Sequence, residues 1–312
     1  MRSQLAYCYP GISLFQMRTM KIFYTLSLVV FIAACSDSKT KTMEKEKKSI
    51  QPNHNISTGY ATVNGINMYY EIQGEGDPLV LIHGGGSTIK TSFGTILPML
   101  AQRFKVIAVE LQAHGHTSDR AAPESFEQDA DDVAALLKHL SIYKAHLLGF
   151  SNGGNTAMRI AMRHPELVNK LVLISSFYKR EGMLPGFFEG MQHATLENMP
   201  ALLKSGYLQI KNDEKGLLTM FTKDRDRMIQ FKDWDDSELR SIKAPAFVIC
   251  GDHDVVTAEH TVKMSQLIPN AQLMILPGTH GSFIGEICSF EEGSKMPEMT
   301  VRTIEEFLNR PM

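Results

Sequence analysis

A serine flanked by glycines is the clearest candidate for covalent chemistry in the chain. Residues 149–153 read Gly-Phe-Ser-Asn-Gly, with an apolar run before them and a helical pattern after them. A serine at such a strand-to-helix turn is forced into a strained backbone conformation, and its hydroxyl then projects from the sheet. Gly149 and Gly153 leave room for the tight crossing. The motif therefore predicts that Ser151 is a nucleophile.

The residue after this serine adds a second chemical feature. The backbone amide of Asn152 lies in the first turn of the expected helix, so it would point at an oxyanion formed on the group that Ser151 attacks. Two elements must position both residues: a buried strand over 145–150 and a helix closed by Pro165. The strand is inferred from a continuous apolar run, and the helix from apolar residues at three- and four-residue spacing.

The composition of the chain narrows the class of function. It has 312 residues, of which 43% are hydrophobic and 21% charged, and this length allows one large α/β domain or two average ones. A net charge of -2 gives no support for nucleic acid as a partner. Four cysteines are too few and too scattered for a disulfide scaffold or a zinc site. We expect Cys250 and Cys288 to be buried thiols rather than a bridge.

The N-terminal residues have the layout of a targeting signal. Residues 20–35 hold a lysine near the start, an apolar run, and small residues before Cys35. The Ile-Ala-Ala-Cys sequence that ends there resembles the lipobox of bacterial lipoproteins, which implies that Cys35 is lipidated and becomes the first mature residue. A plain signal peptide or a single membrane anchor is the alternative. Residues 1–19 precede this signal, and we expect translation to start at Met17 or Met20.

The segment after the signal differs in composition from everything that follows. Residues 36–56 are rich in Ser, Thr, Lys, Glu and Asn and almost free of apolar side chains, so they cannot bury a core and are typical of a solvated tether. The folded domain is expected over 57–312. We therefore predict a protein exported to the bacterial cell envelope, attached to a membrane through Cys35, and facing either the periplasm or the cell surface.

The domain begins with strands and then alternates strands with helices. Strands are expected over 59–63 and 66–72 around the Asn64-Gly65 pair, the strongest short signal for a hairpin. A buried strand over 79–82 leads into His-Gly-Gly-Gly at 83–86. This alternation predicts a mostly parallel sheet covered on both faces. Further along we expect a helix over 93–104, a strand over 105–110, a loop over 111–118, a helix through Asp129 to Leu140, and a strand over 171–174.

This order of motifs resembles the α/β-hydrolase fold. The resemblance rests on the opening hairpin, His-Gly-Gly-Gly after the third strand, a Gly-rich loop after the fourth and the serine motif after the fifth, and it covers about Ser57 to Leu308. It implies an eight-stranded, mostly parallel sheet with helices on both faces and a catalytic triad in the order Ser, acid, His. The Met- and Phe-rich segment at about 176–244 would be a helical cap inserted after strand six.

The resemblance also implies where the acid and the base lie. An apolar strand over 246–250 ends in Gly-Asp-His-Asp, and another over 273–276 ends in Pro-Gly-Thr-His-Gly. The acid follows the first of these strands in the family and the histidine follows the second, which maps the base to His280. The second acid of the turn usually has the role, so Asp254 is assigned. Asp252 is the alternative, and otherwise holds the turn through backbone amides.

The His-Gly-Gly-Gly loop of this resemblance would supply the rest of the oxyanion site. Gly85 is the favoured second oxyanion donor beside Asn152, with Gly86 nearly as good, because glycine lets backbone approach a substrate closely. His83 is expected to brace this loop by hydrogen bonds.

The other histidines are expected to have structural roles. Neither a cofactor nor a metal site is expected, since no His-Glu-x-x-His or similar spacing is present. His114 and His116 are expected to support the nucleophile's helix or the pocket wall, and His253 and His260 to be exposed.

The combined expectation is a serine hydrolase that cleaves an ester, a lactone or a related acyl bond of a small molecule through an acyl-enzyme on Ser151. A C–C bond hydrolase, thioesterase, amidase or perhydrolase would use the same triad, and a non-catalytic binding protein on the same fold is the alternative from another class. An apolar cap favours an acyl or ring-bearing pocket, although more than half of its apolar residues must simply pack against the core.

Overall fold

The computed structural model describes residues 56–311. The signal expected over 20–35, its Cys35, and all but the last residue of the tether therefore lie outside the described residues. Within 56–311 no helix is both long enough and apolar enough to cross a membrane.

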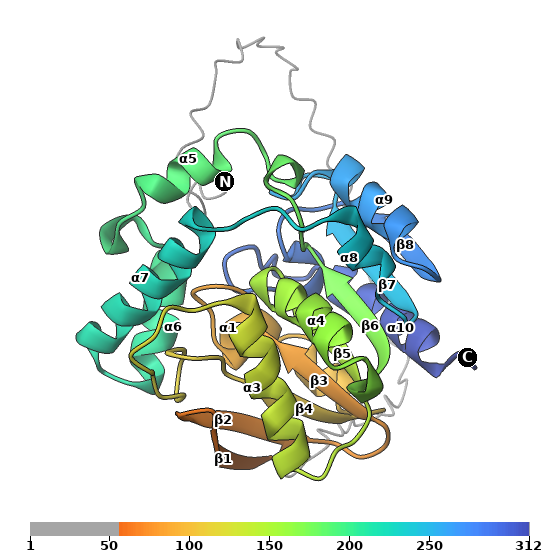
Figure 1. Cartoon of the computed structure of the whole chain (residues 1–312), viewed down its shortest axis with the longest axis horizontal. Helices are drawn as coiled ribbons and strands as arrows, with labels where there is room; N and C mark the ends of the chain where they lie inside the picture. Colours follow the sequence, from red (N-terminus) through yellow and green to blue (C-terminus); the bar gives the residue numbers. More distant parts are fainter. Residues whose placement is uncertain (1–55, 312) are drawn as a thin grey trace, which may run out of the picture. The chain divides into compact units, whose positions relative to one another are not determined.

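The described chain forms one eight-stranded sheet in the order β1-β2-β4-β3-β5-β6-β7-β8 (Figure 1). β2 runs antiparallel to both of its neighbours, and all pairs from β4 to β8 are parallel. The expected fold class is confirmed. The strands are β1 (Ser57–Val63), β2 (Ile66–Gln73), β3 (Pro78–Ile82), β4 (Lys105–Val109), β5 (Ala145–Phe150), β6 (Val168–Ile174), β7 (Ala246–Gly251) and β8 (Ala271–Leu276).

The opening hairpin forms where the turn residues predict it. Asn64 and Gly65 both have positive φ, 43° and 86°, which is the requirement of the two-residue turn that matches strand twist. The register pairs Val63 with Ile66 across that turn.

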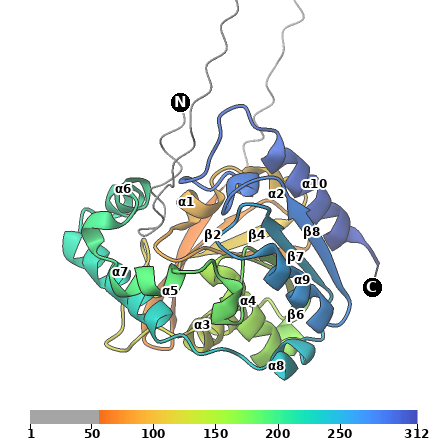
Figure 2. The same cartoon turned by 90° about the horizontal axis from the view of Figure 1, so that it is seen from above.

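Helices cover both faces of the sheet because its strands are apolar on both faces. Along β6, Leu171 and Leu173 belong to one buried cluster, whereas Val172 and Ile174 belong to the other. Alternate residues of a strand point to opposite faces, so two cores result. Figure 2 shows α3 and α4 on one side and α1, α2 and α10 on the other. The core helices are α1 (Ile89–Phe93), α2 (Leu97–Leu100), α3 (Phe126–His139), α4 (Asn152–Arg163), α9 (Ala258–Leu267) and α10 (Met296–Asn309).

The single helix expected over 93–104 is wrong. The structure has two short helices instead: α1 begins after Thr88, whose side chain accepts from the N–H of Thr91, and ends at Phe93 before Gly94. α2 follows, with Pro98 in its first turn. Proline inside a longer helix would remove a backbone hydrogen bond and clash with the preceding turn, so a break before it is required.

A helical cap lies between β6 and β7, as expected. Its helices are α5 (Phe187–Gln192), α6 (Ala201–Ile210), α7 (Glu214–Ile229) and α8 (Asp236–Arg240). α6 approaches α1 closely: a Cβ on Gly206 would lie 2.5 Å from Cγ2 of Thr91, so glycine permits this contact. Phe177, Phe231 and Trp234 join the same buried cluster as α3 and α4. Much of the aromatic content of the cap therefore packs it onto the core.

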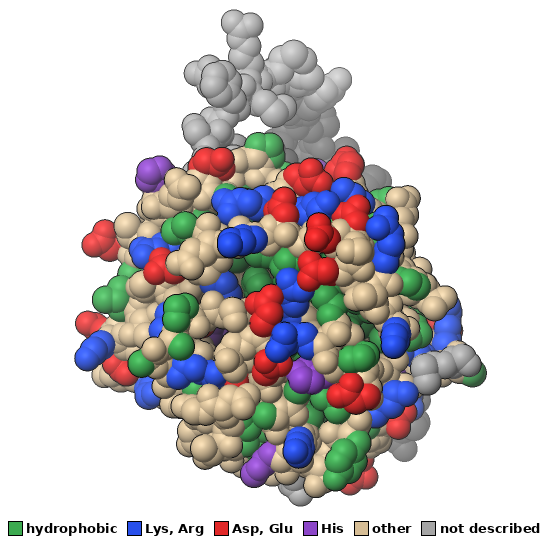
Figure 3. All heavy atoms as spheres, viewed as in Figure 1, with side chains coloured by type: hydrophobic (Ala, Val, Ile, Leu, Met, Phe, Trp, Pro, Cys, Tyr) green, Lys and Arg blue, Asp and Glu red, His purple; other side chains and the backbone are tan. Residues whose placement is uncertain are grey.

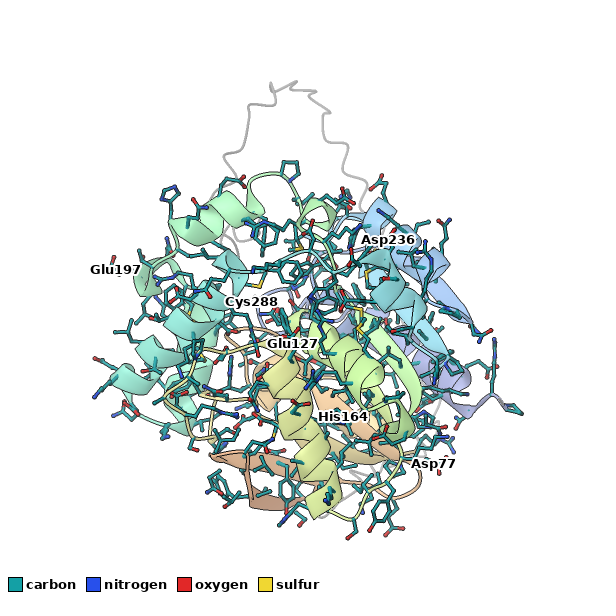
Figure 4. All side chains as sticks on the ribbon, viewed as in Figure 1. Asp77, Glu127, His164, Glu197, Asp236 and Cys288 are labelled. Carbon is teal, nitrogen blue, oxygen red and sulfur yellow. The ribbon has the colours of Figure 1, made fainter. Side chains whose placement is uncertain are left out.

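Charged side chains fasten the end of the cap. Arg159 on α4 lies 3.8 Å above the Trp234 ring and pairs with Glu127 on α3 and Glu238 on α8. Figure 4 places Glu127 on α3 and Asp236 near α8. On the face drawn in Figure 3, acidic and basic side chains are interspersed rather than gathered into regions of one sign.

The helix α9 was not expected from the sequence. His260 lies on this helix, and the expectation that His260 is exposed is wrong. His260 is buried, its Nε2 accepts from the N–H of Tyr178 at 3.2 Å, and the two rings stack. Burial lowers the pKa of His260 to about 4. His253, in contrast, is exposed as expected.

Candidate active site

Ser151 stands at the junction of β5 and α4 in a strained conformation. Its φ of 54° and ψ of -124° lie in a region that residues with a side chain rarely adopt. The N–H of Ser151 donates to the carbonyl of Ile174 at 2.8 Å, which ties the turn to β6. The flanking glycines are sterically required: a Cβ on Gly149 would lie 2.2 Å from the carbonyl of Gly153, and one on Gly153 would lie 2.0 Å from that of Ile82.

Asp254 is a buried carboxylate with a full set of donors. Its Oδ1 accepts from the N–H of Val255 at 2.7 Å, and its Oδ2 accepts from the hydroxyl of Ser175 at 2.5 Å and from the N–H of Gly251 at 3.2 Å. Burial alone would raise the pKa of Asp254, but the nearby His280 and these hydrogen bonds hold it below its usual value. The group is therefore ionised at neutral pH.

The imidazole of His280 meets this carboxylate. Nδ1 of His280 lies 2.7 Å from Oδ1 of Asp254, so Nδ1 is the nitrogen that donates and Nε2 faces elsewhere. The ring also packs on Phe150, with centroids 4.8 Å apart, and Phe150 is the residue immediately before Ser151. The structure thus brings the expected acid and base together beside the serine turn.

Asp252, the alternative acid, is placed differently. Its side chain is exposed, and its Oδ1 accepts from the N–H of Gly278 at 2.8 Å. It joins the turn after β7 to the turn after β8 and does not contact the imidazole of His280. This is the turn-holding position that the sequence allowed for it.

His83 links two loops at the carboxyl edge of the sheet. Its Nε2 accepts from the N–H of Leu111 at 3.0 Å, and its Nδ1 lies 2.7 Å from the carbonyl of Gly84. Because Nε2 accepts, the proton must be on Nδ1, which donates. Burial, assisted by the charge of His114, lowers the pKa of His83 to about 3, so the ring stays neutral. The expected bracing of the loop by hydrogen bonds is what the geometry provides.

The candidate oxyanion donors differ in what their N–H groups already contact. The N–H of Gly86 donates to Oδ2 of Asp224, a residue of the cap. Within residues 56–311, the N–H groups of Gly85 and Asn152 donate to no protein group. The two residues are adjacent in space, since a Cβ on Gly85 would lie 2.5 Å from Nδ2 of Asn152. This contrast favours Gly85 over Gly86 as the partner of Asn152.

Comparison with known proteins agrees with this geometry. A family model for the alpha/beta hydrolase fold matches residues 77–206. The crystal structure of the enol-lactonase from Burkholderia xenovorans LB400 superposes with a TM-score of 0.63 and 25% identity, over 80% of this chain and all of that one. The chain has the α/β-hydrolase fold.

The chain's relatives include two whose names state an activity. The human serine hydrolase BPHL is 29% identical over 246 residues, which cover 72% of this chain and 80% of that protein. A 2-hydroxymuconate semialdehyde hydrolase of Pseudomonas sp. strain CF600 is 30% identical over 198 residues, 62% of each chain.

Within residues 56–311, the hydrogen bonds and ring contacts of His114 and His116 in the Gly-rich loop go to groups outside α4. Nδ1 of His116 lies 2.9 Å from Oε2 of Glu110 and its ring stacks on Tyr69, so it supports the loop and the opening hairpin. The hydrogen bond from His116 to Glu110 raises the pKa of His116. His114 is buried and contacts Asp224 through Nε2 at 2.9 Å. It therefore joins the core to the cap.

Sequence reasoning missed two residues beside the site. Ser175 follows β6 with a positive φ of 53° and donates to Asp254; a serine pair directly after a buried strand was the available signal. Asp224 contacts the His-Gly-Gly-Gly loop from α7, and nothing local marks it among the other charged residues of that helix. A separate cavity of about 340 Å³ lies between α7 and residues 119–124, and Ser151, Asp254 and His280 do not line it.

The described residues contain no cluster of His, Cys, Asp and Glu side chains suited to a metal ion. Cys250 and Cys288 are not joined to each other by a disulfide, as expected. Cys250 is buried as expected, whereas Cys288 (Figure 4) is only half-buried.

Proposed function

We propose that this α/β hydrolase is a serine hydrolase that cleaves a carboxylic ester, a lactone or a related acyl bond through an acyl-enzyme on Ser151. The observation that carries the proposal is the 2.7 Å contact between His280 and a buried Asp254 at the edge of the sheet where Ser151 has its strained turn. Supporting it are the name and the likeness of the human serine hydrolase.

The chemistry assigns one role to each side chain. A serine hydroxyl is a poor nucleophile at neutral pH, so His280 takes its proton through Nε2 during attack and returns a proton to the leaving group. Asp254 holds the ring with Nδ1 protonated and stabilises the imidazolium that forms. The N–H groups of Gly85 and Asn152 bind the developing oxyanion, each contributing about 3 kcal/mol in the transition state.

The substrate class is inferred from the cap. A Cβ on Gly86 would lie 3.1 Å from Cε of Met199 and 3.8 Å from Cδ1 of Leu203, so apolar cap residues cover the loop that would bind the oxyanion. Met199 belongs to a cluster with Tyr207, Leu217 and Met220. Such a roof favours a small-molecule acyl substrate with an apolar acyl chain or ring.

A second candidate is hydrolysis of a carbon–carbon bond by the same three residues. It is favoured by the likeness to the 2-hydroxymuconate semialdehyde hydrolase. Steady-state turnover on acyl esters, lactones and a ring-cleavage semialdehyde, compared in one set of assays, separates the two: preference for an ester or a lactone supports the first candidate.

Covalent labelling tests the nucleophile directly. A fluorophosphonate probe should modify the protein at Ser151, located by mass spectrometry of the labelled peptide. The Ser151→Ala variant should remain unlabelled, while Ser176→Ala should label like the unaltered protein. Labelling that persists in Ser151→Ala would show that another residue is the nucleophile.

We further propose that the protein is attached to the bacterial cell envelope through a lipid on Cys35. The support is the signal-like sequence of residues 20–35. Cys35→Ser should move the protein from the membrane fraction to the soluble fraction and abolish incorporation of radiolabelled palmitate, whereas Cys288→Ser should do neither. Palmitate incorporation that survives in Cys35→Ser would rule out this anchor.

A further inference from the structure

One carboxylate of the cap reaches the loop that would form the oxyanion hole. Asp224 on α7 is buried, and its Oδ2 accepts both from the backbone N–H of Gly86 and from Nε2 of His114, the latter at 2.9 Å. Its Oδ1 accepts from the guanidinium of Arg227 on the same helix. Gly86 is 138 residues away from Asp224 in the sequence, so this contact joins the cap to the core.

The partners of Asp224 are themselves fixed. Nδ1 of His114 lies 2.7 Å from the carbonyl of Gln112, so both ring nitrogens of His114 face acceptors and both must carry protons. Burial alone would lower the pKa of His114, but Asp224 raises it to about 9. Arg227 also binds Asp129 of α3 at 2.7 Å. Asp224 is thus a carboxylate between two cations, each of which is held by the core.

The contact between Asp224 and Gly86 holds the peptide unit that follows Gly85, the proposed oxyanion donor. The N–H of Gly85 belongs to the peptide unit whose carbonyl is that of Gly84, and this carbonyl accepts from His83. The N–H of Gly86 belongs to the following peptide unit, and Asp224 holds it. Gly85 lies between the two planes, and glycine permits rotation of either plane at little steric cost. Three hydrogen bonds therefore keep the N–H of Gly85 directed. His83 and the N–H of Ser87, the latter at 3.3 Å, hold the Gly84 carbonyl from the core, and Asp224 holds the N–H of Gly86 from the cap.

We propose that Asp224 is a positioning residue, which holds the Gly85–Gly86 peptide so that the N–H of Gly85 is aimed at the oxyanion. It follows that the oxyanion hole is complete only while α7 is seated on the core. This inference rests on the proposed function, because it concerns the transition state of acyl transfer at Ser151.

A purely structural role for Asp224 predicts a different result. If the residue only anchors the cap, then any break in the same ionic cluster that destabilises the protein equally should change activity equally. Asp129 offers the matched control: it is buried, it pairs with the same Arg227, and it does not contact Gly86. Asp226, half-exposed two residues from Asp224 and paired with Arg225, controls for the substitution itself.

The experiment compares Asp224→Asn, Asp129→Asn and Asp226→Asn in the full chain, with active sites counted by fluorophosphonate labelling to completion. The amide of Asp224→Asn cannot accept from Gly86 and His114 on one side and from Arg227 on the other. Since loss of one oxyanion donor lowers kcat by about 100- to 1000-fold, a misdirected donor should lower kcat by about 30-fold or more, with KM nearly unchanged. The affinity of a trifluoromethyl ketone, which forms a tetrahedral adduct, should fall by the same factor.

The controls decide the outcome. Asp226→Asn should behave as the unaltered protein, and Asp129→Asn should lower the melting temperature while leaving kcat per active site unchanged. An unchanged kcat in Asp224→Asn, or an equal loss in Asp129→Asn, would overturn the inference while leaving the hydrolase proposal intact. Absence of hydrolysis and labelling in the unaltered protein would instead refute the proposed function. Should Asp224→Asn fail to fold, Asp224→Glu keeps the charge but moves the carboxylate, and the same loss of kcat at near-constant KM is expected.

Discussion

Replacing Ser151 by glycine should make the protein more stable than replacing it by alanine. The backbone of Ser151, with φ 54° and ψ -124°, occupies a region that glycine enters freely. A residue with a side chain destabilises the folded state by about 1–3 kcal/mol there. Glycine loses about 0.4–1 kcal/mol more than alanine through the entropy of the unfolded chain. Taken at the midpoints of these two ranges, about 2 and about 0.7 kcal/mol, the difference leaves Ser151→Gly about 1.3 kcal/mol more stable than Ser151→Ala. This corresponds to a shift in melting temperature of about 3–5 °C.

The assay is urea unfolding of both variants at pH 7, where both lack the proposed nucleophile and differ only in the Cβ. Ser237, exposed within α8, is the matched control, because glycine inside a helix is less stable than alanine by about 0.5–1 kcal/mol. The two sites should therefore differ in the sign of the Gly-minus-Ala difference. If glycine is the less stable choice at both positions, the strained turn at Ser151 is not a property of the folded protein.

Two further substitutions test the surroundings of Asp254, the proposed acid of the triad. Ser175→Ala removes the 2.5 Å hydrogen bond to Asp254 and should lower the free energy of unfolding by about 1.5–3 kcal/mol at pH 7. Because folding lowers the pKa of Asp254, its charge stabilises the protein above the unfolded pKa of about 3.9, and this stabilisation is lost as the pH falls. Urea unfolding should therefore show a smaller difference in stability between Ser175→Ala and the unaltered protein near pH 3 than at pH 7. A difference that does not depend on pH would contradict a hydrogen bond from Ser175 to an ionised Asp254. Ser176→Ala, whose hydroxyl donates only to the Ile174 carbonyl, is the control. Asp252→Asn, whose amide oxygen still accepts from Gly278, should keep near-normal turnover in an ester assay, and a collapse of turnover would make Asp252 the acid.

The features that could be predicted from the sequence depend on local physics. The hairpin follows from the Asn64-Gly65 turn, and the serine turn follows from glycines whose replacement would bring a Cβ within about 2.2 Å of backbone oxygens. The strands carry continuous apolar runs because both faces of the sheet are covered. Each of these signals lies within a few residues of the element that it specifies.

The features that were missed depend on contacts between distant segments. α9 has a weak apolar pattern, and the burial of His260 on it results from packing against Tyr178, 82 residues away. The break before α2, in contrast, has a local signal in Pro98. Asp224 could not be found from sequence, because its significance depends on Gly86 and His114, which only the folding of the cap onto the core brings to it.

The most direct test of the proposed triad is the turnover of His280→Ala, Asp254→Asn and the double variant on one activated ester. Residues that act as a unit are non-additive, so the double variant should be about as slow as the slower single variant, with losses on the order of 10³-fold or more and the fold intact by circular dichroism. Near-normal turnover of His280→Ala, or losses that multiply in the double variant, would contradict the claim that Asp254 acts through His280 on Ser151.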